Sequence, residues 1–168
     1  MSDFGEIVEC YTKTAVIQLQ RIPKAAKNVV TQNVNVTIAP LMRQGGSLRT
    51  ADYSQKLTIQ LVESDLANFA IALMGLRSST EIKGSDVGNY SKVLYVNVNE
   101  DQTTNIIISF YSKGNTTNSN VSQSITFKNS ERYPLLRLVV TQLTKNSTQY
   151  EQTVADTLNL LKASVLRP

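Results

Sequence analysis

The spacing of apolar residues in this chain changes from strand-like to helix-like twice, in the same order. Apolar and polar residues alternate in a half-buried strand, whereas apolar residues recur about every 3.6 positions in an amphipathic helix. In the first half, strands are predicted at 14–20, 34–38 and 56–62, and Pro40 is expected to close the second of them. A helix follows, whose apolar face is formed by Leu66, Phe69, Ala70, Leu73 and Met74.

The second half repeats this order of elements. Strands are predicted at 94–98 and 106–110 around a hairpin loop, and a polar turn leads to a third strand at 122–128. Pro134 then lies in the first turn of a helix, where a missing N–H costs little. The apolar face of this helix is formed by Tyr133, Leu136, Val140 and Leu143. Residues 77–92 contain two glycines and have no period, so they are predicted to be a loop between the halves.

Capping residues predict where the helices begin. Ser64 is the expected N-cap of the first helix, and Asp65 is an anion in its first turn. Thr148 and Glu151 have the spacing of a capping box, which predicts a C-terminal helix at about 148–166. One side of that helix carries Val154, Leu158, Leu161 and Val165.

These elements predict an α+β fold, in which antiparallel sheets have their helices on one side. At 168 residues and 41% hydrophobic composition, the chain is long enough for one domain with a substantial core. We therefore expect a single domain over 1–168, with repeat one at about 7–76, repeat two at about 92–145 and the C-terminal helix as an addition.

The composition removes most catalytic and metal chemistry. The chain has no histidine and one cysteine, which excludes Ser/His/Asp and Cys/His triads, histidine or multi-thiolate zinc sites, iron–sulfur clusters and an internal disulfide. Carboxylate chemistry is the alternative that remains, on Glu63 and Asp65 or on Glu100 and Asp101. These acidic residues are few and scattered, and a helix start and a turn explain them better than a catalytic pair does. Gly45 and Gly46 are not followed by the Gly-Lys-Ser/Thr of a phosphate loop. The sequence therefore predicts a protein that is not an enzyme and has no cofactor or metal site.

The sequence also predicts a protein that stays in the cytoplasm. The first nine residues have no basic stretch followed by an apolar one, as a secretory signal would, and they are too acidic for a transit peptide. The longest apolar-leaning run, at 66–76, is far shorter than the roughly 20 residues that cross a bilayer. No membrane span is expected.

Basic and tyrosine side chains gather near the predicted sheet elements. Seventeen Lys and Arg against thirteen Asp and Glu give a net charge of +4, which favours an anionic partner. Tyrosines provide stacking surfaces for bases, and cations neutralise phosphates. The alternative is that the tyrosines are half-buried strand residues and the cations, Lys128 among them, a solvated rim. The candidate nucleic-acid-binding residues are Lys13, Arg43, Arg49, Lys56, Lys92, Lys113, Tyr11, Tyr53, Tyr95 and Tyr111.

Several segments resemble the plant Whirly family of single-stranded DNA-binding proteins. Residues 51–73 (ADYSQKLTIQLVESDLANFAIAL) resemble an entry of the type Tyr-Asp-x-x-x-Lys that leads into a strand and then a helix. Residues 11–16 (YTKTAV) lie where that family has Lys-Gly-Lys-Ala-Ala-Leu, of which Lys13 is kept. Residues 92–94 (KVL) resemble a strand start of the family, and 125–136 resemble its strand-to-helix junction. The resemblance spans roughly 7–145.

The resemblance implies two four-stranded antiparallel sheets packed roughly perpendicular, with helices at the centre of a tetramer and bases lying on protruding strands. The fourth strands would lie at 6–11 and within 110–118. Its functional implication is non-catalytic, largely sequence-independent single-stranded DNA binding in replication, recombination or repair. The tryptophans, transit peptide and acidic tail of the family are absent, which favours a phage or bacterial relative. Kinetoplastid guide-RNA-binding proteins and positive-cofactor-type coactivators have similar folds.

Two alternatives use the same sequence features. The first is single-stranded RNA binding or annealing on the same surface, as in the guide-RNA-binding proteins. The second is a structural or assembly protein without nucleic-acid binding, for which the Asn/Thr-rich loop at 115–120 and the modest charge are equally natural.

Overall fold

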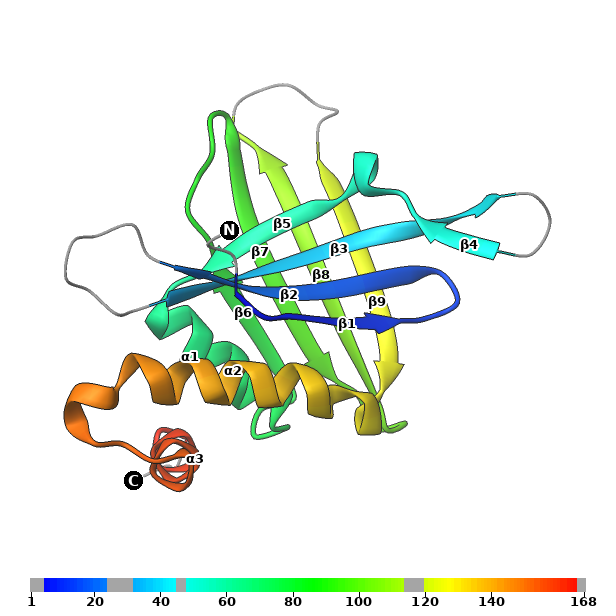
Figure 1. Ribbon diagram of the computed structural model, residues 1–168. Helices are drawn as coiled ribbons and strands as arrows, with labels where there is room; N and C mark the ends of the chain where they lie inside the picture. Colours follow the sequence, from blue (N-terminus) through cyan, green and yellow to red (C-terminus); the bar gives the residue numbers. More distant parts are fainter. Residues whose placement is uncertain (1–4, 24–31, 45–47, 114–119, 166–168) are drawn as a thin grey trace.

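The computed structural model describes residues 5–23, 32–44, 48–113 and 120–165 (Figure 1). These residues form an α+β fold of two antiparallel sheets with helices on one side, as the sequence predicts. Sheet one has the order β1–β2–β3, and β3 is long enough to pair with both β4 and β5. Its strands are β1 (Ile7–Tyr11), β2 (Ala15–Pro23), β3 (Gln32–Gln44), β4 (Leu48–Ala51) and β5 (Leu57–Leu61).

Sheet two follows the first along the chain, and its strands run across those of sheet one (Figure 1). Its order, β6–β7–β8–β9, is a simple meander of neighbouring antiparallel strands. Its strands are β6 (Ser79–Lys83), β7 (Tyr90–Val98), β8 (Thr103–Ser112) and β9 (Val121–Lys128).

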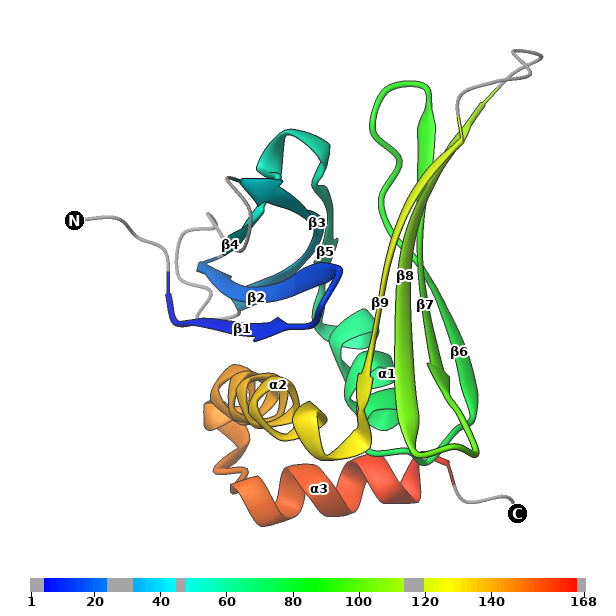
Figure 2. The ribbon, with the colours of Figure 1, turned by 90° about the vertical axis from the view of Figure 1, so that its right-hand side faces the viewer.

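The helices lie together at one end of the two sheets (Figure 2). Helix α1 (Glu63–Leu73) follows β5, and α2 (Tyr133–Asn146) follows β9 through the 3-10 turn η2 (Asn129–Arg132). Helix α3 (Val154–Ala163) packs against both α1 and α2. Two further 3-10 turns are η1 (Tyr53–Gln55) and η3 (Thr148–Tyr150). Within the described ranges, none of the helices has the length and apolar character needed to cross a membrane.

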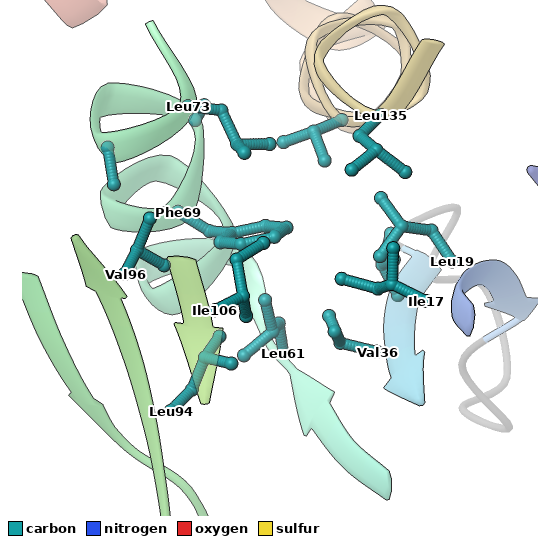
Figure 3. Packing of buried hydrophobic residues seen from close by; sticks show 14 of the residues in the cluster. Ile17, Leu19, Val36, Leu61, Phe69, Leu73, Leu94, Val96, Ile106 and Leu135 are labelled. Carbon is teal, nitrogen blue, oxygen red and sulfur yellow. The ribbon is translucent and has the colours of Figure 1, made fainter. Parts of the chain in front are cut away.

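One hydrophobic core joins both sheets to the helices. Phe69 of α1 lies at its centre, between side chains of sheet one and sheet two (Figure 3). The alternation predicted from the sequence decides which strand residues enter this core, because alternate side chains point to opposite faces of a sheet. The core residues around Phe69 include Ile17, Leu19, Val36, Leu61, Leu94, Val96, Ile106 and Leu135.

The loop prediction for 77–92 is wrong in part, because this segment contains β6 and the start of β7. The fourth strand of sheet two is β6. Of the segment 110–118, where that strand is expected, residues 110–112 complete β8, and the residues from 114 lie outside the described ranges. Strand β6 is an edge strand that contributes Ile82 to the core. One apolar residue is too few to show the alternation of apolar and polar residues that predicts a strand. In sheet one, β1 lies within 6–11, where the resemblance implies a strand. The four-stranded expectation is nevertheless wrong for this sheet, because β4 pairs with the end of β3 and makes it five-stranded.

The predicted end of β3 at Pro40 is also wrong, because β3 continues to Gln44. Pro40 pairs with Ala15 at the last position of the β2–β3 ladder, and it is Leu41 that donates its N–H to the Thr14 carbonyl, over 2.8 Å. The missing N–H of proline therefore interrupts no ladder bond at the point where β3 changes partners.

Two predicted helix caps differ from those observed. The N-cap of α1 is Val62, which is extended and has no capping side chain, because β5 runs almost directly into the helix. Helix α3 begins at Val154 and not at 148, since Glu151 adopts a left-handed φ of 54° and ends the preceding turn. Its capping box is formed instead by Thr153 and Asp156, whose side chains each accept the other's backbone N–H.

Candidate nucleic-acid interface

Tyr95 and Tyr111 form a pair on the outer face of sheet two, the face turned away from the core. Their hydroxyl groups lie 2.9 Å apart. Val93 and Ser109 also belong to this face and pair across β7 and β8, yet each is only 7% exposed. Tyr95 lies two residues after Val93 on β7, and Tyr111 lies two residues after Ser109 on β8. Because the two strands are antiparallel, the tyrosines lie on opposite sides of the Val93–Ser109 pair. The two side chains therefore reach toward each other across Val93 and Ser109 and cover them.

The hydrogen bond between the two hydroxyls is the main cause that raises the pKa of Tyr95 to about 12. Partial burial and the negative charge of Glu81 add to this rise. Because the folded pKa lies above the ordinary value of 10.0, the Tyr95 hydroxyl is neutral at physiological pH. The Tyr95 ring thus carries no negative charge that would repel a phosphate.

A second pair of tyrosines is formed by Tyr11, on β1 of sheet one, and Tyr53, in the 3-10 turn η1 between β4 and β5. Tyr11 is 52% exposed and stands opposite Val16 on the outer face of this sheet. Val16 and Ala39 pair across β2 and β3 and are buried, although both lie outside the core cluster. Partial burial raises the pKa of Tyr11, and hydrogen bonding to Glu9 and Tyr53 raises it further. The four tyrosines predicted from the sequence therefore form two pairs, one on sheet two and one between β1 of sheet one and the turn η1.

Four of the predicted cations flank sheet one. Lys13 is exposed in the β1–β2 turn, where the Thr12 hydroxyl accepts the N–H of Ala15 over 3.2 Å. Lys56 is exposed between η1 and β5. Neither lysine forms an ion pair with another described residue. The other two cations, Arg43 and Arg49, pair directly opposite each other across β3 and β4, while the side chains of both lie outside the described residues.

The remaining two predicted cations are engaged within the molecule. Lys92 lies on the inward face of sheet two, where its ammonium donates to the Thr58 carbonyl over 3.1 Å and lies 4.8 Å from the Phe110 ring centre. Burial lowers the pKa of Lys92, yet the group bridges the two sheets as a donor. Lys113 forms an ion pair with Asp86. Both ammonium groups have partners that a phosphate would have to displace.

Several residues of the outer faces were not among the candidates. Strand β9 places Thr126 and Lys128 on the outer face, because they alternate with the core residues Ile125 and Phe127. Asn105 of β8 belongs to the same face and donates to the Thr126 hydroxyl over 2.9 Å. The same alternation that predicts the strand could have identified these polar positions. No group of three Asp, Glu or Cys side chains that could hold a metal ion occurs within the described ranges.

Comparison with known proteins places this arrangement in a Whirly-like fold. WHY3 from Arabidopsis thaliana matches with a TM-score of 0.66 and 20% identity, over 97% of this chain and 98% of that one. WHY1 from the same plant matches with a TM-score of 0.65 and 20% identity, over 97% and 94%. Trypanosome MRP1/MRP2 matches with a TM-score of 0.54 and 13% identity, over 88% and 87%. No protein-family model and no curated protein sequence matches the chain.

Proposed function

We propose that this protein binds single-stranded DNA, largely without regard to base sequence, and that it is not an enzyme. The observation that carries the proposal is the tyrosine pair Tyr95–Tyr111 on the outer face of sheet two. Because every base has a π-face, exposed aromatic rings hold bases of any identity. The Whirly-like fold and the second pair, Tyr11 on sheet one with Tyr53 in the turn η1, support the same function.

The cations near sheet one supply the electrostatic part of this binding. Among the described residues no carboxylate is paired with Lys13 or Lys56, so both ammonium groups can neutralise phosphates. The β3–β4 hairpin adds Arg43 and Arg49. Lys92 and Lys113 contribute less in this proposal because their ammonium groups have partners. A charged surface that follows the backbone makes binding sensitive to salt, since cations released from the strand drive association.

We further propose that the protein acts as a homotetramer. The helix residues predicted for the oligomer centre, such as Leu66, Phe69 and Val140, are buried within one chain. A groove of about 590 Å³ between the helices is instead lined by the exposed side chains of Val62 and Leu160. A second copy would cover this apolar surface. Light scattering is expected to give about four times the 18.6 kDa chain mass, and a mass of one chain would refute the assembly.

The first test is fluorescence anisotropy of a labelled oligo-dT of about 30 nucleotides with the whole chain. We expect the logarithm of the binding constant to fall linearly with the logarithm of salt concentration. Duplex DNA should not displace the labelled oligo-dT. Competition by oligo-U distinguishes RNA binding, because both strands would use the same rings and cations. Absence of binding at micromolar protein in low salt would refute the proposal and favour a structural role.

A role in replication, recombination or repair follows from sequence-independent binding, because these processes expose single strands of every sequence. Within such a role, the protein would cover strands in a phage-infected or bacterial cell. The absence of tryptophan, by which the chain differs from the plant family, supports this setting.

A further inference from the structure

A cleft of about 390 Å³ lies where the β1–β2 turn of sheet one meets strand β9 of sheet two. The turn stands beside β9 in both views (Figures 1 and 2), and β2 contacts β9. Tyr11 and Lys13 line the cleft from sheet one. Thr126 and Lys128 line it from sheet two.

The position of these residues makes the cleft a passage between the outer faces of the two sheets. Tyr11 belongs to the outer face of sheet one, where it stands opposite Val16, and it forms a pair with Tyr53. Thr126 and Lys128 belong to the outer face of sheet two, because they alternate with core residues on β9. Since β1 and β9 are edge strands, a polymer that leaves one outer face at this edge reaches the other without crossing the core.

The charge of the cleft favours an anion. Lys13 and Lys128 enter it from two different sheets, and within the described ranges neither forms an ion pair. Glu131 also lines the cleft, but its carboxylate accepts the backbone N–H of Lys128 over 2.9 Å. Two ammonium groups therefore face one carboxylate that is already hydrogen-bonded. The Thr126 hydroxyl adds a neutral donor, whereas the Tyr11 hydroxyl is hydrogen-bonded to Glu9.

We propose that this cleft holds phosphate groups of a single strand that passes from the outer face of sheet one to that of sheet two within one chain. The inference rests on the proposed function and adds Lys128 and Thr126 to the residues that contact the strand. It also joins the two tyrosine pairs into one continuous path, in which bases stack before and after the cleft while phosphates cross between Lys13 and Lys128.

The test compares the variants K13Q and K128Q and their double variant with wild type, each as the whole chain. For single strands, the slope of log K against log salt is about 0.7 for each phosphate that the protein neutralises. Each single variant should therefore lower the slope by about 0.7 and the double variant by about 1.4. If the plots of log K against log salt for wild type and variant meet at 1 M salt, each lysine replaced weakens binding about fivefold at 0.1 M salt. K162Q, on exposed Lys162 of α3, is the matched control and should not change the slope.

Two further outcomes would overturn the inference. If K13Q and K128Q have the slope of K162Q while wild type binds oligo-dT, the cleft holds no phosphate and only the proposed function stands. Failure of wild type to bind oligo-dT would refute the proposed function and this inference together. Urea unfolding of each variant verifies that the exposed substitutions leave the fold intact.

Discussion

Replacing Tyr95 and Tyr111 by alanine is expected to produce the largest loss of oligo-dT affinity of any surface change in this protein. A base stacked on an aromatic side chain contributes about 1–3 kcal/mol, so each ring removed should weaken binding about 5- to 150-fold. The loss should appear as a higher dissociation constant with little change in salt slope, because no charge is removed. Anisotropy titrations at two salt concentrations measure both quantities.

Two controls separate stacking from other effects of the tyrosine substitutions. The double variant Y95F/Y111F removes the hydroxyl–hydroxyl hydrogen bond of 2.9 Å but keeps both rings, so its affinity should stay close to that of wild type. Y150A removes a ring that is 74% exposed in η3, beside the helices, and should not affect binding. If Y95A/Y111A binds oligo-dT as wild type does, the outer face of sheet two is not the stacking surface.

Replacing Phe69 by alanine is expected to be the most destabilising single truncation in the chain. The Phe69 side chain is 0% exposed and lies between residues of both sheets and the helices (Figure 3). Removing a buried phenylalanine ring costs about 3–5 kcal/mol, from the transfer free energy of the ring and the cavity left behind. Because the ring lies between both sheets, the cavity would weaken the packing that holds their outer faces in register.

Urea unfolding followed by circular dichroism measures this effect as a lower midpoint at an unchanged m-value. V154A is the matched control, because Val154 is on α3, is 49% exposed and lies outside the groove that contains Leu160. Its free energy of unfolding should stay within about 0.5 kcal/mol of wild type. A decrease of less than about 1 kcal/mol for F69A would show that the site collapses around the truncated side chain and that the two sheets do not depend on this ring.

The alternating strands and the two helices after them could be predicted because a strand with one buried face has an alternating sequence. Val34, Val36 and Ile38, for example, all enter the core. Strand β6 could not be predicted from alternation, because Ile82 is the residue by which it enters the core. Its pairing with β7 defines β6 as a strand, and that pairing leaves no pattern of apolar residues. The start of α3 could not be predicted, because it depends on the left-handed φ of Glu151, and the pattern of apolar and polar residues does not reveal that backbone conformation.

Part of the candidate site could be predicted from the same alternation. Lys92 lies two and four residues before the core residues Leu94 and Val96 on the same strand, so alternation already places it on the inward face. Tyr95 lies between Leu94 and Val96 and therefore faces outward. The pairing of Tyr95 with Tyr111 could not be predicted, because it depends on the register that sets Val93 opposite Ser109. The cleft also required the tertiary structure, since its walls come from different sheets.

The most direct test of the account is to map where a single strand lies on the protein. Ultraviolet crosslinking of the whole chain to oligo-dT, followed by mass spectrometry of the peptides, identifies the residues in contact with bases. We predict crosslinks to Tyr95 and Tyr111 on sheet two, to Tyr11 on sheet one and to Tyr53 in the adjoining turn η1. Crosslinks confined to the helices at 133–163, with none on either sheet, would contradict the claim that the outer faces of the sheets bind the strand.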